Sequence, residues 1–259
     1  MNQDLKNKII NYYTKYYRDD CCLPNFKAKI KQRLDEEKNE EIRIKKLSQK
    51  SGLDFYNKKI CLIGAGTGGL AITLKQKYYS QVFGIEPNKE ALAIIKEKCL
   101  FYQLDPANFN SSPAEKISFE DNKFDIVYCF TVLEHVKDIK KSLNEMIRIT
   151  KPDGKIYINT PNYSYPYEEH YKIPFPTFLP KIIGFLYLII LGKSPRFLKT
   201  INFITVRKLN YILSQKTNII WQYFYEPPIP NHGRASWLLN FFKFTLNIYS
   251  TQEIIITKK

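Results

Sequence analysis

The sequence predicts an α/β fold built on a doubly wound, mostly parallel sheet, and three observations support this prediction. Between residues 58 and 162, short apolar runs alternate with helical patterns, which is typical of parallel strands joined by crossover helices. A glycine-rich loop follows the first apolar run directly and opens a helix. Near the end of the chain, two segments at about 218–224 and 246–257 indicate an antiparallel edge to the sheet.

Residues 1–57 predict a helical cap that precedes the sheet. An aromatic and Lys-rich stretch is followed by a break at residues 23–25, and a single helix is expected from about 26 to 50. The middle of that helix, RLDEEKNEE, is expected to be a mostly solvated face. Gly52 ends the helix, because glycine interrupts a helical pattern at low cost.

Residues 58–162 predict the core of the domain. The first strand is a short, wholly apolar run, as expected for a strand that helices cover on both faces. The expected elements are a strand at 60–63, a helix at 68–78, a strand at 81–86, a helix at 88–102, a strand at 124–130, a helix at 137–149 and a strand at 155–160. Residues 151–154 are expected to form a turn before the last strand, with Pro152 at its second position.

A Pro- and aromatic-rich insertion is expected at 163–204. Its most apolar run, 182–191, is bracketed by Lys181 and Lys193. The run has half of the roughly 20 residues that a transmembrane helix needs. A buried helix is favoured over a helix that lies in a membrane interface with its cations facing anionic headgroups. A helix at 205–215 follows, and residues 58–259 are expected to form one domain.

The chain is basic, with 40 Lys and Arg against 25 Asp and Glu and a net charge of +15. A positive chain suits nucleic acid, anionic lipid or phosphorylated substrates. However, most of these cations are Lys, in a chain also rich in Asn, Ile, Tyr and Phe, so the bias is attributed to genome composition. Nucleic-acid binding is therefore disfavoured. The hydrophobic fraction of 44% excludes wholesale disorder.

The N-terminal residues and the cysteines predict a reduced, cytoplasmic protein. The first twenty residues carry charges where a signal peptide needs an apolar run. The five cysteines are odd in number, and no pair has the spacing of a metal site or redox motif. No cluster of His, Cys and carboxylates has metal-ligand spacing either, so no metal is expected.

The glycine-rich loop predicts a nucleoside-binding site. Gly64-Ala65-Gly66-Thr67-Gly68-Gly69 lies between a strand and a helix, and glycines allow a ligand to approach the backbone closely. The next strand ends in Glu86, which can accept hydrogen bonds from a ribose diol, and Pro87 then turns toward the next helix. The glycine spacing by itself fits both a dinucleotide and S-adenosylmethionine.

The segments ISFEDNKFDIVYCFTVLEHVKD and SLNEMIRITKPDGKIYINTPN resemble the class I S-adenosylmethionine-dependent methyltransferases, close to the branch that includes the ubiquinone and menaquinone methyltransferases. The resemblance covers about 58–162. It implies S-adenosylmethionine as cofactor and a Rossmann-like seven-stranded sheet with an antiparallel last strand and an insertion after the fifth strand. It also implies a set of cofactor contacts. Gly64, Ala65, Gly66 and Gly68 hold the methionine end, Glu86 and Pro87 the ribose, Ala114 and Glu115 the adenine, and Phe130 lies beside the cofactor.

Two positions depart from the family's pattern. The family usually carries an acid two residues before the first glycine, where this chain has Leu62. The contact to the cofactor's ammonium group is therefore expected to be weaker or to come from elsewhere. Pro113 replaces the acid that commonly precedes the Ala114 position. Because of these departures, a second hypothesis is a non-catalytic scaffold that binds the cofactor.

Methyl transfer to a hydroxyl requires a base that titrates near neutral pH, which points to histidine. His135 is the first candidate, because the strand that precedes it ends in the crevice where open α/β sheets bind ligands. The alternative is a histidine that only begins a helix. Glu134 is expected on the substrate side, together with Glu169 and His170 of the insertion.

Three acceptor hypotheses follow for a methyltransferase. The first is a small-molecule or sugar O-methyltransferase, and the second acts on a lipid-linked or quinone acceptor at the membrane surface, with peripheral membrane contact through 178–199. The third is a nucleic-acid methyltransferase that uses the basic C-terminal third. The insertion and residues 226–244 are expected to determine acceptor specificity. The sequence does not predict an oligomeric state.

Overall fold

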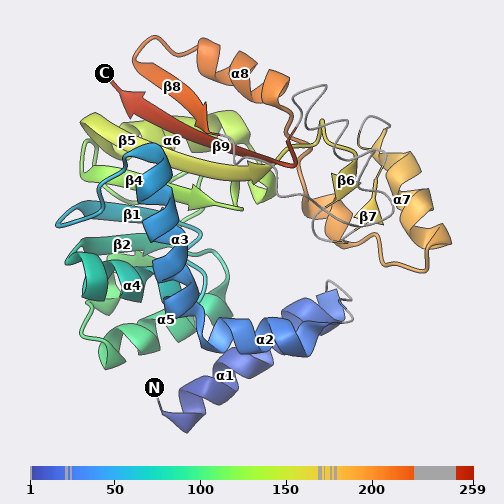
Figure 1. Ribbon diagram of the computed structural model, residues 1–259, viewed down its shortest axis with the longest axis horizontal. Helices are drawn as coiled ribbons and strands as arrows, with labels where there is room; N and C mark the ends of the chain where they lie inside the picture. Colours follow the sequence, from blue (N-terminus) through green and yellow to red (C-terminus); the bar gives the residue numbers. More distant parts are fainter. Residues whose placement is uncertain are drawn as a thin grey trace.

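The computed structural model describes residues 2–20, 23, 25–168, 171, 173–175, 177, 180–224 and 249–259. A seven-stranded sheet in the order β3-β2-β1-β4-β5-β9-β8 forms its centre (Figure 1). The strands are β1 (Lys59–Ile63), β2 (Gln81–Ile85), β3 (Phe109–Asn110), β4 (Phe124–Phe130), β5 (Thr150–Pro161), β8 (Ile219–Phe224) and β9 (Thr251–Lys258). Strand β9 runs antiparallel to both neighbours, and the other neighbouring pairs are parallel. The predicted Rossmann-like sheet with an antiparallel last strand is therefore confirmed.

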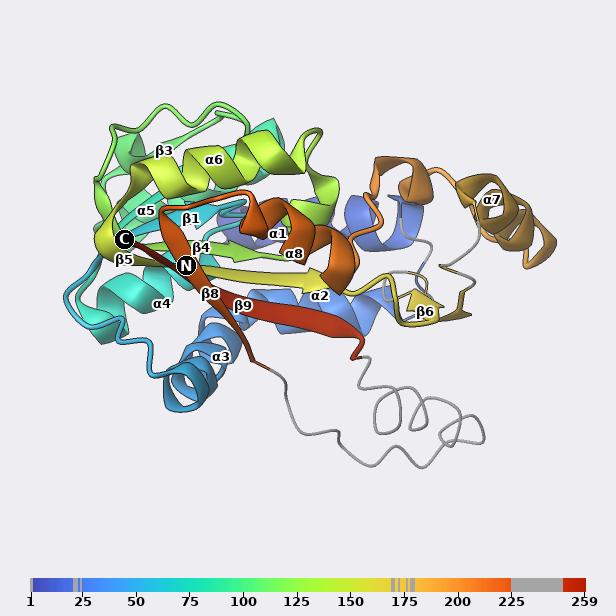
Figure 2. The ribbon, with the colours of Figure 1, turned by 90° about the horizontal axis from the view of Figure 1, so that it is seen from above.

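Helices cover both faces of this sheet (Figure 2). Successive residues of β1 point to opposite faces: Ile60 and Leu62 pack in one buried cluster, and Cys61 and Ile63 in the other. The first cluster includes residues of α3, α4 and α5, and the second includes residues of α6 and α8. The bounds are α3 (Glu36–Ser51), α4 (Gly69–Tyr78), α5 (Lys89–Phe101), α6 (Ile139–Ile149) and α8 (Val206–Ser214).

Side-chain caps fix where several helices begin. Asn88 accepts hydrogen bonds from the amides of Glu90 and Ala91, both at 3.0 Å, and so starts α5. Asp138 accepts from Lys141 at 3.1 Å and starts α6 two residues later than predicted. These caps place the sheet-to-helix loops, where ligands of such folds bind, at defined positions.

The sequence predicts one helix over 26–50, and this prediction is wrong. The structure has α2 (Phe26–Leu34) and α3, separated by Asp35, whose φ of −105° and ψ of 27° are not helical. The break brings Glu36 to the first turn of α3, where it is buried against Lys98. Glu36 and Glu40 are only 4% and 8% exposed, so RLDEEKNEE is not simply a solvated face.

The cap begins with α1 (Gln3–Thr14), which continues into a π-helical turn at Lys15–Asp20. Helix α1 packs against α2 and α5 through a small apolar cluster, with Leu5, Ile9 and Tyr13 on α1 and Ile30 on α2. The cap is thereby anchored to α5, one of the helices that flank the sheet.

Strand β5 starts at Thr150, earlier than predicted, and residues 151–154 form an irregularity within it. The pairing shifts between Phe124 opposite Thr150 and Ile126 opposite Lys155. Asp153 has a φ of +60°, so the Pro152 segment bends the backbone as a turn does, but inside a strand. Strand β3 was not predicted, because its two residues are too few to give an alternating pattern.

The insertion carries α7 (Lys181–Ile190) and a two-stranded ribbon of β6 (Tyr167–Glu168) and β7 (Ile173–Pro174). Helix α7 projects away from the main sheet (Figures 1 and 2). Gly184 and Leu188 are buried, but Ile182, Leu186, Ile189 and Ile190 are 62%, 55%, 58% and 81% exposed. The preferred prediction of a buried helix is therefore wrong for most of this helix, since only one of its sides packs against residues that the structure describes. No helix in the described ranges is long and apolar enough to cross a bilayer.

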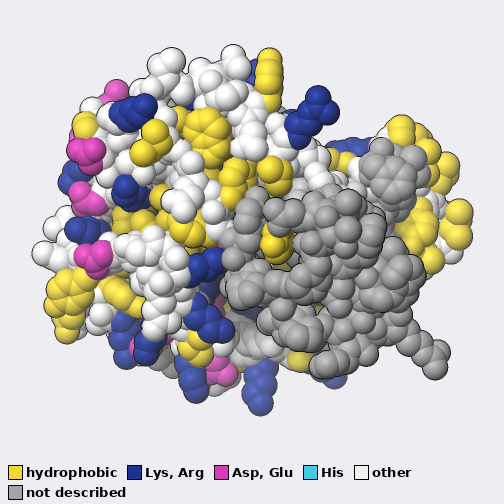
Figure 3. Space-filling model, turned by 45° about the horizontal axis from the view of Figure 1, so that its top comes forward, with side chains coloured by type: hydrophobic (Ala, Val, Ile, Leu, Met, Phe, Trp, Pro, Cys, Tyr) yellow, Lys and Arg dark blue, Asp and Glu magenta, His cyan; other side chains and the backbone are white. Residues whose placement is uncertain are grey.

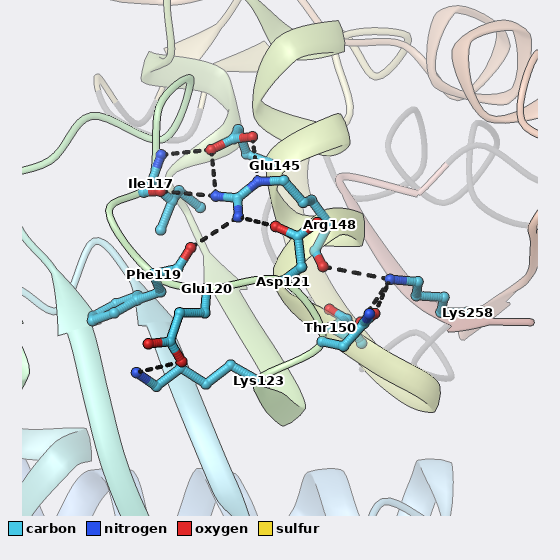
Figure 4. A network of polar contacts seen from close by, with 10 residues as sticks. Ile117, Phe119, Glu120, Asp121, Lys123, Glu145, Arg148, Thr150 and Lys258 are labelled. Atoms are coloured by element: carbon cyan, nitrogen blue, oxygen red, sulfur yellow. Dashed lines mark hydrogen bonds and ion pairs between the residues drawn. The ribbon is translucent and has the colours of Figure 1, made fainter.

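Arg148 of α6 fixes the loop between β3 and β4 (Figure 4). Its guanidinium donates to the carbonyl oxygens of Ile117 and Phe119, both at 2.8 Å, and forms ion pairs with Asp121 and Glu145. Glu145 also accepts from the amide of Ile117 at 2.7 Å. The loop that contains Ala114 and Glu115 is therefore held against α6.

Candidate functional site

The glycine loop between β1 and α4 has a left-handed backbone conformation that residues other than glycine rarely adopt. Gly64, Gly66 and Gly68 have φ values of +72°, +56° and +88°. A Cβ at Gly64 would lie 2.4 Å from Val132, and one at Gly68 would lie 2.5 Å from Ile95. A Cβ at Gly66 would have no atom within 4 Å. Gly64 and Gly68 are thus required for packing, whereas Gly66 faces open space that a ligand can enter.

Glu86, which follows the end of β2, lies beside this loop. Its Oε2 accepts a hydrogen bond from the amide of Gly66 at 2.8 Å, and its Oε1 accepts from Asn88 at 2.9 Å. Burial raises the pKa of Glu86, and these two backbone hydrogen bonds act in the opposite direction. A carboxylate has about four acceptor positions, so two remain for the hydroxyls of a ribose.

A cleft of about 360 Å³ opens over the glycine loop. Its floor includes residues 62–70, Glu86 and Pro87, and its far wall includes Phe130, Thr131, Val132 and His135. The helical cap supplies the remaining wall: Tyr12, Tyr13, Tyr16, Arg33, Glu36, Glu40 and Arg43. Tyr12 is partly buried here, and this desolvation raises the pKa of its hydroxyl to about 12. The hydroxyl therefore stays protonated at neutral pH.

A second, larger cavity of about 680 Å³ adjoins the cleft. It lies over the carboxyl ends of β4 and β5 and includes Asn159, Pro161 and Glu253 in its lining. Both cavities share Tyr16, Arg33, Arg43, Phe130, Thr131 and His135. The guanidinium of Arg43 lies 3.9 Å from the ring centroid of Phe130, so it stacks on this ring at the junction.

The structure brings together most of the predicted site residues. Gly64, Ala65, Gly66, Gly68, Glu86, Pro87, Phe130 and His135 all line the smaller cleft. His135 lies at the junction with the larger cavity, where a catalytic base is expected.

Other predicted residues lie elsewhere. Ala114 and Glu115 do not line either cavity, and the carboxylate of Glu115 accepts from the amides of Lys137 and Asp138 ahead of α6. Glu134 is fully buried and accepts from the hydroxyl of Thr160 at 3.0 Å, so it supports the loop from within. Glu169, His170 and residues 226–244 lie outside the described residues.

A polar cluster behind the glycine loop was missed at the sequence level. The hydroxyl of Thr67 donates to Glu36 at 3.0 Å and is hydrogen bonded to the hydroxyl of Tyr13 at 2.9 Å. Lys98, 1% exposed, pairs with both Glu36 and Glu37. The partners of Glu36 are 31 and 62 positions away in the sequence, so no local pattern predicts the cluster. The one local signal is an acid, Glu36, in the first turn of a helix.

The residues present fit S-adenosylmethionine. Gly66 leaves backbone exposed where a Cβ would otherwise project, and Glu86 retains acceptor capacity for a diol. Leu62 lines the cleft without a charge, as predicted from its sequence position, but Glu36 and Glu40 bring carboxylates to the same cleft from α3. Acids for the ammonium group of a methionine moiety are thus present in the cap.

The core of the chain is similar to known methyltransferases. A family model described as a methyltransferase domain matches residues 62–158. The chain is 28% identical over 121 residues to the ubiquinone biosynthesis O-methyltransferase of Aeromonas salmonicida, covering 47% of this chain and 50% of the relative. It is also 28% identical over 96 residues to the uncharacterized methyltransferase YcgJ of Bacillus subtilis, covering 37% and 38% of the two chains. The chain thus spans half or less of the length of these curated relatives.

Solved structures agree on the fold. A putative sarcosine dimethylglycine methyltransferase from Galdieria sulphuraria superposes with a TM-score of 0.56, at 16% identity, covering 86% of each chain. The matched domain over residues 62–158, with its glycine cradle and Glu86, identifies the core of the chain as a methyltransferase domain of the class I S-adenosylmethionine-dependent type, and the solved structure agrees on the fold alone.

Proposed function

We propose that the protein transfers a methyl group from S-adenosylmethionine to a hydroxyl oxygen of a small-molecule acceptor. The observation that carries the proposal is the junction of the two cavities, which Phe130, Thr131 and His135 line together. The cofactor supplies a methyl group on a positively charged sulfur. Such a displacement needs the acceptor oxygen held about 3 Å away and in line, so positioning supplies much of the rate. A relative named for ubiquinone biosynthesis O-methylation supports oxygen as the acceptor atom.

His135 is the residue proposed to take the proton from the acceptor hydroxyl. Its side chain is 30% exposed, and its Nε2 lies 4.0 Å from the buried Oε1 of Glu134. The backbone amide of His135 donates to the carbonyl of Val132 at 2.8 Å, which fixes the backbone from which the side chain extends. A nearby carboxylate stabilises the imidazolium that forms when the proton is taken.

The backbone before His135 supports a functional role for this loop. Thr131 has a φ of +52°, which is rare for a β-branched residue. Its amide donates to the carbonyl of Asn159 at 2.8 Å, so the neighbouring strand β5 holds the conformation. Strained backbone of this kind is concentrated at functional sites, because folding alone does not favour it.

Glu40 is proposed to contact the cofactor's ammonium group in place of the acid that the family usually has at the position of Leu62. Glu36 already pairs with Lys98 and Thr67, whereas Glu40 pairs with Arg43, which itself lines the cleft. Burial raises the pKa of Glu40, and its ion pair with Arg43 acts in the opposite direction, so a second cation beside it would further stabilise the ionised carboxylate. The ammonium group of a bound methionine moiety is such a second cation.

The exposed face of α7 supports an acceptor presented at an anionic lipid surface. Its exposed isoleucines and leucines are followed in the sequence by Lys193, Arg196 and Lys199, and hydrophobic side chains gather at that end of the molecule (Figure 3). The sequence has no Asp or Glu between positions 170 and 225. An apolar helix whose neighbouring charges in the sequence are cations is typical of an interfacial helix, so an anionic bilayer is the proposed partner.

Calorimetric titration tests the proposed function first. S-adenosylhomocysteine is expected to bind with micromolar affinity, and NAD(H) and NADP(H) are expected not to bind. Labelled S-adenosylmethionine then reports transfer to hydroxylated small molecules. Binding of S-adenosylhomocysteine without transfer to any acceptor supports a non-catalytic protein instead. If neither S-adenosylhomocysteine nor a dinucleotide binds, the cofactor site itself is contradicted.

A further inference from the structure

We infer that the methyl acceptor is an anionic small molecule that carries a carboxylate or phosphate group, an inference that rests on the proposed function. The larger cavity, of about 680 Å³, carries the argument. Glu253 is the one carboxylate among its described lining residues. Five cations line the same cavity: Lys29, Arg33, Arg43, Lys46 and Lys50.

Two of these cations are already neutralised by protein carboxylates. Lys50 pairs with Glu253, whose Oε1 also accepts from the hydroxyl of Tyr157 at 3.3 Å. Arg43 pairs with Glu40. The other three cations, Lys29, Arg33 and Lys46, form no ion pair with any carboxylate that the structure describes. The cavity therefore keeps an excess of positive charge.

The register of two helices directs these cations to one place. Lys29 and Arg33 are four positions apart on α2, and Arg43, Lys46 and Lys50 are spaced by three and four positions on α3. Residues at these spacings share one face of a helix. These cations line the same cavity as Phe130, Asn159 and Pro161 at the carboxyl ends of β4 and β5, so the positive charge is concentrated where the proposed acceptor binds.

The chemistry of the walls favours an anion of limited size. Arg33 donates to the hydroxyl of Tyr17 at 2.9 Å. Burial alone lowers the pKa of Arg33, but Tyr13, Tyr17 and Glu36 outweigh it, so the net pKa is raised and the group stays charged. Unpaired cations that share a partly enclosed cavity repel one another, and a bound anion removes that cost through charge-assisted hydrogen bonds. A cavity of this volume suits a small molecule.

A matched set of probes tests the inference on protein saturated with S-adenosylhomocysteine. Isothermal titration compares 4-hydroxybenzoate and 4-hydroxyphenyl phosphate with the uncharged 4-hydroxybenzamide. At low salt, at least one anion is expected to bind about tenfold or more tightly than the amide, and whichever anion binds better identifies the recognised group. The preference is expected to shrink as the salt concentration rises.

Two double variants separate the cavity from general surface charge. Lys29→Gln with Lys46→Gln removes two cations that line the larger cavity. Lys31→Gln with Lys45→Gln removes two exposed cations of the same helices, and neither of these residues lines a cavity. The first is expected to abolish most of the anion preference, and the second to preserve it, with S-adenosylhomocysteine affinity unchanged in both. Equal binding of anions and amide, no anion binding, or equal loss in both variants overturns the inference. If the wild-type protein does not bind S-adenosylhomocysteine, the proposed function is contradicted instead.

Discussion

The carboxylate of Glu86 accepts a hydrogen bond from the backbone amide of Gly66 at 2.8 Å, so the end of β2 is tied directly to the glycine loop. This contact holds the loop in the conformation that leaves Gly66 open toward the cleft. The same carboxylate is positioned to hold a ribose diol. One side chain thereby shapes the cofactor site and is expected to contact the cofactor.

Replacing Glu86 with Ala is expected to weaken S-adenosylhomocysteine binding by about 1–3 kcal/mol, because charge-assisted hydrogen bonds are lost. Glu86→Gln keeps one acceptor oxygen and is expected to lose less. Calorimetric titration measures both, and circular dichroism checks the fold. Unchanged affinity of the Ala variant would remove Glu86 from the site.

Alanine at Gly64 and at Gly66 is expected to have different effects. Gly64→Ala places a Cβ against Val132 and is expected to lower the free energy of unfolding by about 1–3 kcal/mol. Gly66→Ala strains the backbone at a φ of +56° but meets no protein atom. Its main expected effect is weaker cofactor binding. Thermal melts and titration of both variants give the comparison, and similar profiles for the two would contradict it.

Substituting His135 with Gln is expected to lower the rate of methyl transfer about 10² to 10⁴-fold, because the general base is lost. Cofactor affinity is expected to stay the same. The wild-type rate should fall as the pH drops below the histidine pKa, and the variant's residual rate should lack that dependence. A variant with a wild-type rate and pH profile would show that His135 only begins a helical turn.

Removal of the carboxylate of Glu145 is expected to change stability in a pH-dependent way. The hydrogen bond from Arg148 is the main cause that lowers the pKa of Glu145 below its ordinary 4.5. The folded-state pKa therefore lies below the unfolded value. The stabilisation is fully present above about pH 4.5 and is lost as the pH falls through the folded pKa. Thermal melts of wild type and Glu145→Gln should differ at pH 7 and converge in acid; a constant difference would contradict the assignment.

Two exposed isoleucines of α7 test the proposed membrane contact. Ile182→Ser with Ile190→Ser is expected to abolish flotation with vesicles that contain anionic lipid, with the melting temperature unchanged because both side chains are exposed. Ile42→Ser, at an exposed position of α3, serves as the control. The wild type is expected to float at low salt. Failure of the wild type to float would exclude lipid as the partner of this face.

The sequence by itself determined the sheet, the glycine loop and the position of Glu86. These features depend on local patterns, since apolar runs, helix caps and glycines act over a few neighbouring residues. His135 was also predictable, because it follows the carboxyl end of β4 within five residues.

Only the tertiary structure decided how the cap completes the site. The pairing of Glu36 with Lys98 and Thr67 and the cations that line the larger cavity join residues distant in sequence. No local pattern records such contacts, and RLDEEKNEE has the composition of a solvated helix face. The exposure of α7 was decided in the same way, because an apolar helix is buried only where the rest of the fold supplies a surface to cover it.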